Sequence, residues 1–175
     1  SYAKELTKSK KNSENFANQV LSLLTFSLFG LVILVELFMP LFVSFIAPGF
    51  KSDPEKFILA TELTRITFPF ILFISLASFF SAILNSHNKF AAASAAPIIL
   101  NVVLIIILLC AKYLDDYLVI YMSYGVSVAG FIQMIFLILT LKKIYKPKFK
   151  VNLNLDNKIK IFFKKLLPSI FSSGV

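Results

Sequence analysis

The stretch ITFPFILFISLASFFSAIL, residues 66–84, contains 19 consecutive residues without a charged side chain. A bilayer core requires about 20 mostly apolar residues in a single α-helix. Residues 52–55, Ser-Asp-Pro-Glu, precede this stretch with the signals of a helix start: a capping side chain, an early proline and an acidic first turn. We therefore expect a membrane-spanning helix over residues 57–84.

Three further apolar stretches flank this span. The first covers residues 16–46, and we expect it to bend at Pro40. The others cover residues 90–111 and 117–141. Residues 166–175 are typical of the first turns of another helix, so we expect the chain to be an internal piece of a longer protein.

The composition agrees with a membrane protein. Of the 175 residues, 58% are hydrophobic and 15% are charged, whereas soluble domains contain about 45–50% and 25%. A soluble fold of this length cannot bury so much apolar surface. The sequence predicts an all-α fold: a polytopic transmembrane helical bundle with four complete spans and the start of a fifth.

The basic residues are distributed unevenly between the two sides of these spans. With the N-terminal end in the cytoplasm, 14 of the 18 basic residues lie on the inner side, nine of them in residues 142–165. Inner loops of membrane proteins carry such an excess. The net charge of +9 is then explained by topology, not by nucleic-acid binding. Residues 158–167 alternate lysines with large apolar residues, which fits either an amphipathic helix on anionic lipid or a topology-setting loop.

Enzyme motifs are largely missing. The chain has one histidine, no G-x-S-x-G and no Gly-rich phosphate loop. We interpret His87 as a solvated loop side chain, with a ligand or proton relay as the alternative. Asp115 and Asp116 are adjacent in an outer turn, but hard cations need more oxygen ligands than two. We predict no catalytic residue, no bound metal and no cofactor.

Polar residues within the spans are more informative, because burying them in lipid is costly. We interpret Glu36 as lying near the outer headgroups, with a water-filled cavity as the alternative. Arg65 is interpreted as an interfacial anchor, with contact to lipid headgroups as the alternative. Asn101 and Gln133 are expected to face other helices, where amides form hydrogen bonds.

Two prolines within the apolar stretches are expected to break their helices. Pro69 and Pro97 each lie near one membrane surface. Broken helices suit transporters, although they also occur in rigid bundles. Together with the missing enzyme motifs, these features predict transport or lipid handling more than catalysis.

Several short stretches occur in a fixed order along the chain: APGF at 47–50, ELTRITFPFIL at 62–72, AILNS at 82–86 and APIILN at 96–101. Together they resemble the MurJ/MviN family, the bacterial flippases for the lipid-linked peptidoglycan precursor lipid II. The resemblance implies that the spans are helices three to six of a fourteen-helix fold of the multidrug/oligosaccharidyl-lipid/polysaccharide exporter type, in its N-terminal lobe. Ala93 departs from the proline that the family often has there.

The resemblance implies alternating-access transport of an undecaprenyl-linked peptidoglycan precursor across the bacterial cytoplasmic (inner) membrane. Its implied partners are this precursor, membrane lipids and the remainder of the same chain, without nucleic acid. The alternatives are a related polysaccharide-lipid flippase or drug exporter, a membrane enzyme acting on polyprenyl lipids, and a non-transporting scaffold. The candidate cavity residues are Arg65, Asn85, Asn101 and Gln133, and the candidate gating residues are Pro69 and Pro97.

Overall fold

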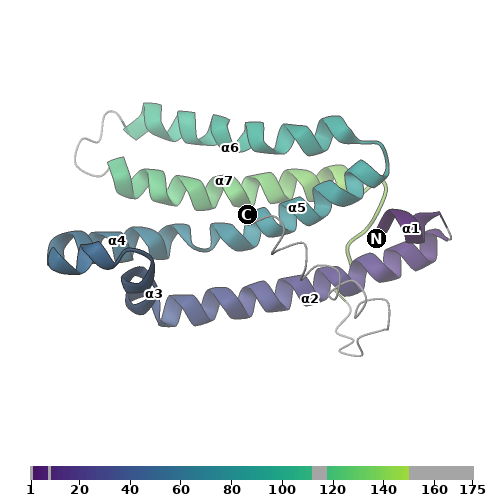
Figure 1. Cartoon of the computed structure of the whole chain (residues 1–175). Coiled ribbons are helices and arrows are strands. Elements are labelled where there is room, and N and C mark those ends of the chain that lie inside the picture. Colours follow the sequence, from purple (N-terminus) through teal and green to yellow (C-terminus); the bar gives the residue numbers. More distant parts are fainter. Residues whose placement is uncertain (1, 8, 112–117, 150–175) are drawn as a thin grey trace.

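The computed structural model describes residues 2–7, 9–111 and 118–149. All elements in these ranges are helices, as predicted. They are α1 (Tyr2–Leu6), α2 (Lys10–Leu37), α3 (Met39–Ile46), the 3-10 helix η1 (Pro48–Ser52), α4 (Pro54–Thr67), α5 (Phe70–Ser86), α6 (Phe90–Ala111) and α7 (Leu118–Leu141) (Figure 1). The predictions for Asp115, Asp116, most of the basic segment 142–165 and the partial span 166–175 lie outside the described residues.

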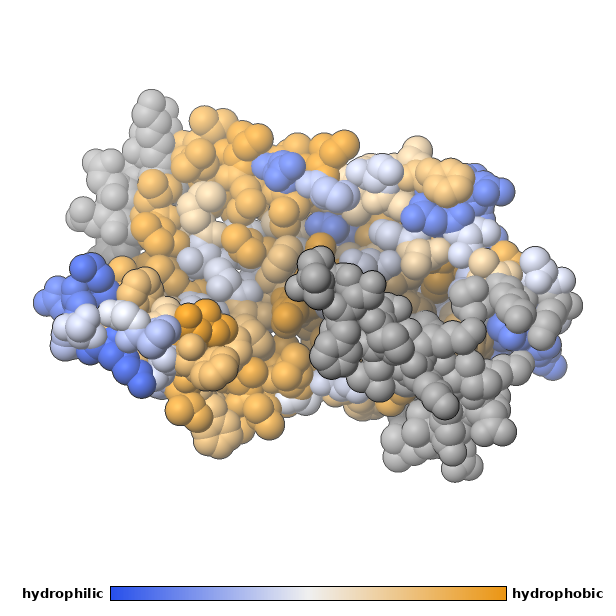
Figure 2. All heavy atoms as spheres, viewed as in Figure 1, coloured by the Kyte–Doolittle hydropathy of each residue, from blue (hydrophilic) through white to orange (hydrophobic). Residues whose placement is uncertain are grey.

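Four helical segments are long and apolar enough to cross a membrane, which confirms the predicted number of spans. They are Lys10–Leu37, Pro54–Ser86, Phe90–Cys110 and Leu118–Leu141. Hydrophobic residues cover much of the middle of the molecule, and hydrophilic residues gather mainly toward its two ends (Figure 2). This distribution is that of a multi-pass membrane protein, whose apolar surface faces lipid.

The first span differs in detail from the prediction. Its long helix, α2, begins at Lys10 and ends at Leu37, and α3 follows after Phe38 with Pro40 in its first turn. Proline lacks an N–H group, and its ring clashes with the carbonyl group four residues earlier. The expected bend at Pro40 is therefore a complete helix break two residues before it.

Helix α7 lies between α5 and α6 and also contacts α4 (Figure 1). Two glycines permit this close packing. A Cβ atom at Gly125 would lie 2.6 Å from Cδ1 of Ile107 on α6, and one at Gly130 would lie 2.5 Å from Cδ2 of Phe70 on α5. Small residues allow membrane helices to approach one another where van der Waals packing drives association.

Buried apolar side chains form two clusters. The larger joins α2, α5 and α7 and includes Leu21, Phe80 and Leu137. The smaller joins the end of α2 to α3 and includes Met39 and Val43, with aromatic side chains of α4 and its end packed against it. The bundle is thus held together at both ends.

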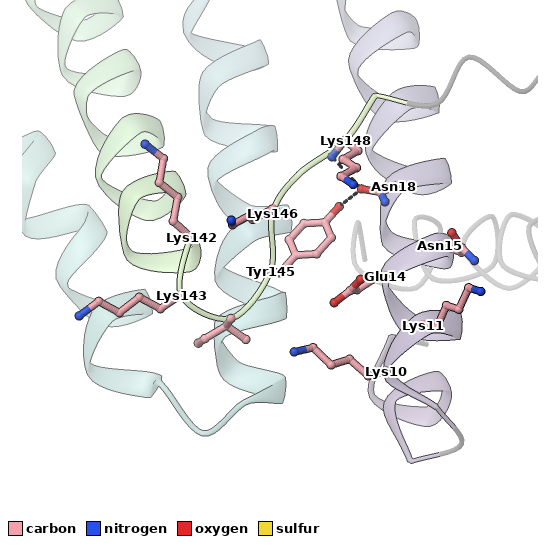
Figure 3. Close-up of a pocket in the computed structure, with 11 residues that line it drawn as sticks. Lys10, Lys11, Glu14, Asn15, Asn18, Lys142, Lys143, Tyr145, Lys146 and Lys148 are labelled. Carbon is pink, nitrogen blue, oxygen red and sulfur yellow. Dashed lines mark hydrogen bonds between the residues drawn. The ribbon is translucent and has the colours of Figure 1, made fainter.

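The segment after α7 returns to α2 at the lysine-rich end of the bundle (Figure 3). The buried Tyr145 hydroxyl donates a 2.5 Å hydrogen bond to Oδ1 of Asn18, and the backbone N–H of Lys148 donates a 2.8 Å bond to the same oxygen. Burial raises the pKa of the Tyr145 phenol, so its hydroxyl stays protonated and able to donate. We call this the Asn18–Tyr145 contact.

Candidate functional site

The second span is broken near its middle. Helix α4 ends at Thr67 and α5 begins at Phe70, with Pro69 between them. Pro69 has no N–H group to donate to the carbonyl of Arg65, four residues earlier. Two backbone bonds of the shorter three-residue spacing follow, each 3.1 Å long. The regular hydrogen bonding of the span is thus interrupted at Pro69, while Phe68 and Pro69 keep right-handed helical dihedral angles.

A serine from α7 supplies a hydrogen bond at this break. The Ser127 hydroxyl donates a 2.6 Å bond to the carbonyl oxygen of Ile66. Ile66 lies in the last turn of α4, where carbonyl groups lose their partners within the helix. In an apolar bundle, neighbouring helices must satisfy such groups. Ser127 and Gly130 therefore place α7 directly against the break.

An ion pair lies one turn before the break. Nε of Arg65 on α4 is 3.4 Å from Oε2 of Glu36 on α2, and the two side chains are 51% and 25% exposed. Opposite charges that pair are the usual way for ionisable residues to be accommodated in spans. The second carboxylate oxygen of Glu36 is buried and has no hydrogen-bond partner in the part of the chain that the structure describes. The pair joins the end of α2 to α4.

These features together provide polar groups within a helical bundle. Among the described residues, no three His, Cys, Asp or Glu side chains gather as metal ligands. A proline irregularity within a span, with a carbonyl group bound by a neighbouring helix and a charged pair nearby, provides polar groups comparable to those at the broken helices of transporters. We take the Pro69 break and its contacts from α2 and α7 as the candidate functional site.

The other predicted residues do not join this site. Gln133 is buried in α7, as expected, but its Oε1 atom has no hydrogen-bond partner among the described residues. Asn101 is exposed on α6, so the expectation that it packs against another helix is wrong for the described helices. Asn85 is exposed near the end of α5, about 30 Å from Arg65 along the span at 1.5 Å per residue.

Pro97 does not break its helix, which corrects the second predicted break. Helix α6 is continuous from Phe90 to Ala111 with Pro97 inside it. The proline removes one donor, from the carbonyl of Ala93, but a complete break would free further carbonyl groups. A continuous helix keeps the other backbone groups of α6 hydrogen-bonded within the span.

His87 differs from the predicted solvated side chain. It is half-buried at the end of α5, and its Nε2 atom lies 3.0 Å from the hydroxyl oxygen of Tyr2. Burial, with a smaller effect of the Lys10 charge, lowers the pKa of His87. His87 is therefore neutral at pH 7 and ties α1 to α5.

Two contacts of the site were not predicted from the sequence. Ser127 precedes Gly130 by three residues, and a small polar residue beside a glycine in a span is a signal of close helix contact. Glu36 and Arg65 were assigned separately to the outer side. Their opposite charges at the same end of neighbouring spans were the signal that they pair.

Comparison with known proteins identifies the family. The family model described as lipid II flippase MurJ matches residues 1–175, which is the whole chain. The chain belongs to the MurJ family. A probable lipid II flippase MurJ of Rickettsia prowazekii (strain Madrid E) is 36% identical to it over 178 residues, which cover 99% of this chain and 34% of the relative.

Other MurJ relatives match shorter parts. A probable lipid II flippase MurJ of Rhizobium tropici is 41% identical over 126 residues, covering 70% of this chain and 24% of the relative. The lipid II flippase MurJ of Burkholderia cenocepacia is 36% identical over 102 residues, covering 57% and 19%. The chain spans about a third or less of the length of these curated relatives.

Proposed function

We propose that this chain forms most of the N-terminal lobe of a fourteen-helix MurJ protein that moves lipid II across the bacterial cytoplasmic membrane. The match of the MurJ family model to residues 1–175 carries this proposal. The four spans would be helices three to six, with the N-terminal end in the cytoplasm, as the lysine distribution supports. The cargo is the undecaprenyl-linked peptidoglycan precursor, and the remainder of a longer chain supplies the other helices.

The mechanism that we propose is alternating access. A pyrophosphate group is costly to move through lipid, so a cavity must replace its water with cations and hydrogen-bond donors. The polyprenyl tail stays in the bilayer while the two lobes rock and open the cavity to the other side. This transport makes and breaks no covalent bond, so it requires no catalytic residue.

Within this chain, the Pro69 break is the proposed point at which the second span changes direction between the two states. The Ser127 hydrogen bond and the Glu36–Arg65 pair both cross from the break to other helices. Noncovalent contacts between helices are able to exchange partners as the lobes move. Pro97 lies in a continuous helix and is not proposed as a gate.

The proposed cavity residues are the same four that were named from the sequence. Arg65, half-exposed beside Glu36, is the candidate for contact with the anionic headgroup. Asn101 is exposed on α6, where helices outside this chain are able to cover it. Asn85 and Gln133 complete the set as candidate hydrogen-bonding groups.

Complementation tests the proposed function. The full-length gene that contains this chain is expressed in bacteria depleted of their essential lipid II flippase. We expect growth with normal cell shape. A second strain carries the Rickettsia prowazekii relative with its matching segment replaced by residues 1–175, which tests this chain directly.

Membrane insertion of each protein is measured in parallel by fractionation. The unaltered relative is the positive control, and the relative without the matching segment is the negative control. Lysis of both test strains despite normal insertion would contradict lipid II transport. It would instead favour a related exporter with another lipid or a drug as cargo.

A further inference from the structure

A basic cavity of about 410 Å³ opens at the lysine-rich end of the bundle, between the start of α2 and the segment after α7 (Figure 3). Six lysines line it, and Glu14 is the one acid in its lining. The lysines are Lys10, Lys11, Lys142, Lys143, Lys146 and Lys148. So strong an excess of positive charge favours an anionic ligand.

An apolar cavity of about 440 Å³ lies beside the basic one. Its lining includes Leu21, Phe80 and Phe149. Lys142 and Lys146 line both cavities. A cationic cavity and an apolar groove are therefore adjacent, a combination that fits a ligand with an anionic head and a hydrocarbon chain.

The Asn18–Tyr145 contact lies in the lining of the basic cavity. Asn18 is 4% exposed and Tyr145 is 1% exposed, and Asn18 accepts hydrogen bonds from both Tyr145 and the backbone of Lys148. In Figure 3 the segment carrying Lys142, Lys146 and Lys148 crosses over toward α2. The lysines thus lie on a segment that is anchored by buried hydrogen bonds.

The position along the span also fits a lipid. Lys142 directly follows Leu141, the last residue of α7. The basic cavity therefore lies where this span leaves the bilayer, at the depth of phospholipid phosphates, and the apolar groove extends toward the hydrocarbon core, since it reaches Leu21 and Phe80.

We propose that the two cavities together bind one anionic phospholipid of the leaflet at this end of the bundle, with its phosphate in the basic cavity and an acyl chain in the apolar groove. A soluble phosphate has no hydrocarbon chain that would occupy the apolar groove. The sugar–peptide head of a peptidoglycan precursor exceeds drug-sized ligands, which already fill cavities of about 300–1,000 Å³. The proposal is independent of the transported cargo.

Residues 1–175 contain no tryptophan, so a Phe149→Trp substitution gives a fluorescent reporter in the groove once any tryptophan in the rest of the longer protein is replaced by phenylalanine. The complete chain carrying this substitution is reconstituted in phosphatidylcholine vesicles. Brominated phosphatidylglycerol or brominated phosphatidylcholine is then titrated as the quencher. We expect the anionic lipid to quench this tryptophan with several-fold higher apparent affinity.

The double substitution Lys142→Gln and Lys146→Gln removes the two charges shared by the cavities. We expect most of the preference for phosphatidylglycerol to be lost, since each lysine near an anionic surface contributes about fivefold to affinity. Lys89→Gln is the matched control, because Lys89 is an exposed lysine at the same end that lines neither cavity. This control should keep the preference. Circular dichroism checks that all variants retain their helix content.

Three outcomes would overturn the proposal. The first is equal quenching by the two lipids in the reporter protein. The second is an equal loss of preference in the Lys89→Gln control, which would indicate general surface attraction. The third is loss of the preference when inorganic phosphate is added at constant ionic strength, which would indicate a site for free phosphate.

Discussion

Pro69 and Pro97 lie in neighbouring spans of the bundle, but their helices differ. At Pro69 the helix stops and restarts, and α7 contributes the Ser127 hydroxyl and the space beside Gly130. At Pro97 the helix continues as the single element α6, from Phe90 to Ala111. Proline removes one donor at both positions. The two positions differ in what the neighbouring helix α7 contributes.

The largest expected effect is at the glycine beside the break. Gly130→Ala would place a Cβ atom 2.5 Å and 2.8 Å from two ring atoms of Phe70 and 3.3 Å from Cβ of Phe73. We expect the free energy of unfolding to fall by about 2–3 kcal/mol, as for other overpacked sites. Unfolding in detergent micelles, followed by circular dichroism, measures it.

Gly125→Ala is the control for this substitution. Its Cβ atom would meet the terminal Cδ1 atom of Ile107 at 2.6 Å, and a flexible side chain can move away. We expect a loss of about 1 kcal/mol or less. Equal losses at Gly125 and Gly130 would show that the break has no special packing requirement.

The next effect distinguishes the two prolines directly. Pro97→Ala should raise the free energy of unfolding by about 2 kcal/mol, because proline costs up to about 3 kcal/mol relative to alanine inside a helix. Pro69→Ala should raise the free energy of unfolding by a smaller amount, because the surrounding contacts already accommodate this proline. The same unfolding measurement compares them, and a larger gain at Pro69 would reverse our interpretation.

A smaller effect is expected from the serine at the break. Ser127→Ala should lower the free energy of unfolding by about 1 kcal/mol, the usual contribution of a hydrogen bond between membrane helices. The cost should be close to zero in the Pro69→Ala background, where the helix supplies its own donors. Ser123→Ala is the control, since this hydroxyl bonds to Val119 within α7. If Ser127→Ala costs the same with and without the Pro69→Ala substitution, the proposed coupling is contradicted.

The smallest effect is expected from the ion pair. Glu36→Gln should lower the free energy of unfolding by about 0.5 kcal/mol, because partly exposed pairs contribute little. A double-mutant cycle with Arg65→Gln isolates the pair. The exposed Asp53–Lys56 pair at the start of α4 is the reference. A coupling energy several times larger for Glu36 and Arg65 would mean that the pair, more than Ser127, fixes the break.

The sequence was sufficient to predict the all-α class and the number of spans, because apolar length is set by the bilayer. It also pointed to Pro69, where α4 and α5 meet. The prediction of a break at Pro97 was wrong. Each proline removes one backbone donor, and only the tertiary structure shows that Ser127 lies near Pro69. Asn101 was expected to face another helix and is exposed, because the sequence does not show which side of α6 its neighbouring helices cover.

The Asn18–Tyr145 contact has a consequence for biosynthesis. Its two partners are 127 residues apart in the chain. At about 5–20 residues per second, the ribosome makes Asn18 roughly 6–25 s before Tyr145. Until then the Asn18 side chain lacks both of these donors, and the start of α2 is not attached to the segment after α7. The hydrogen bonds between the start of α2 and the segment after α7 therefore form only after the last of the four spans has been synthesised.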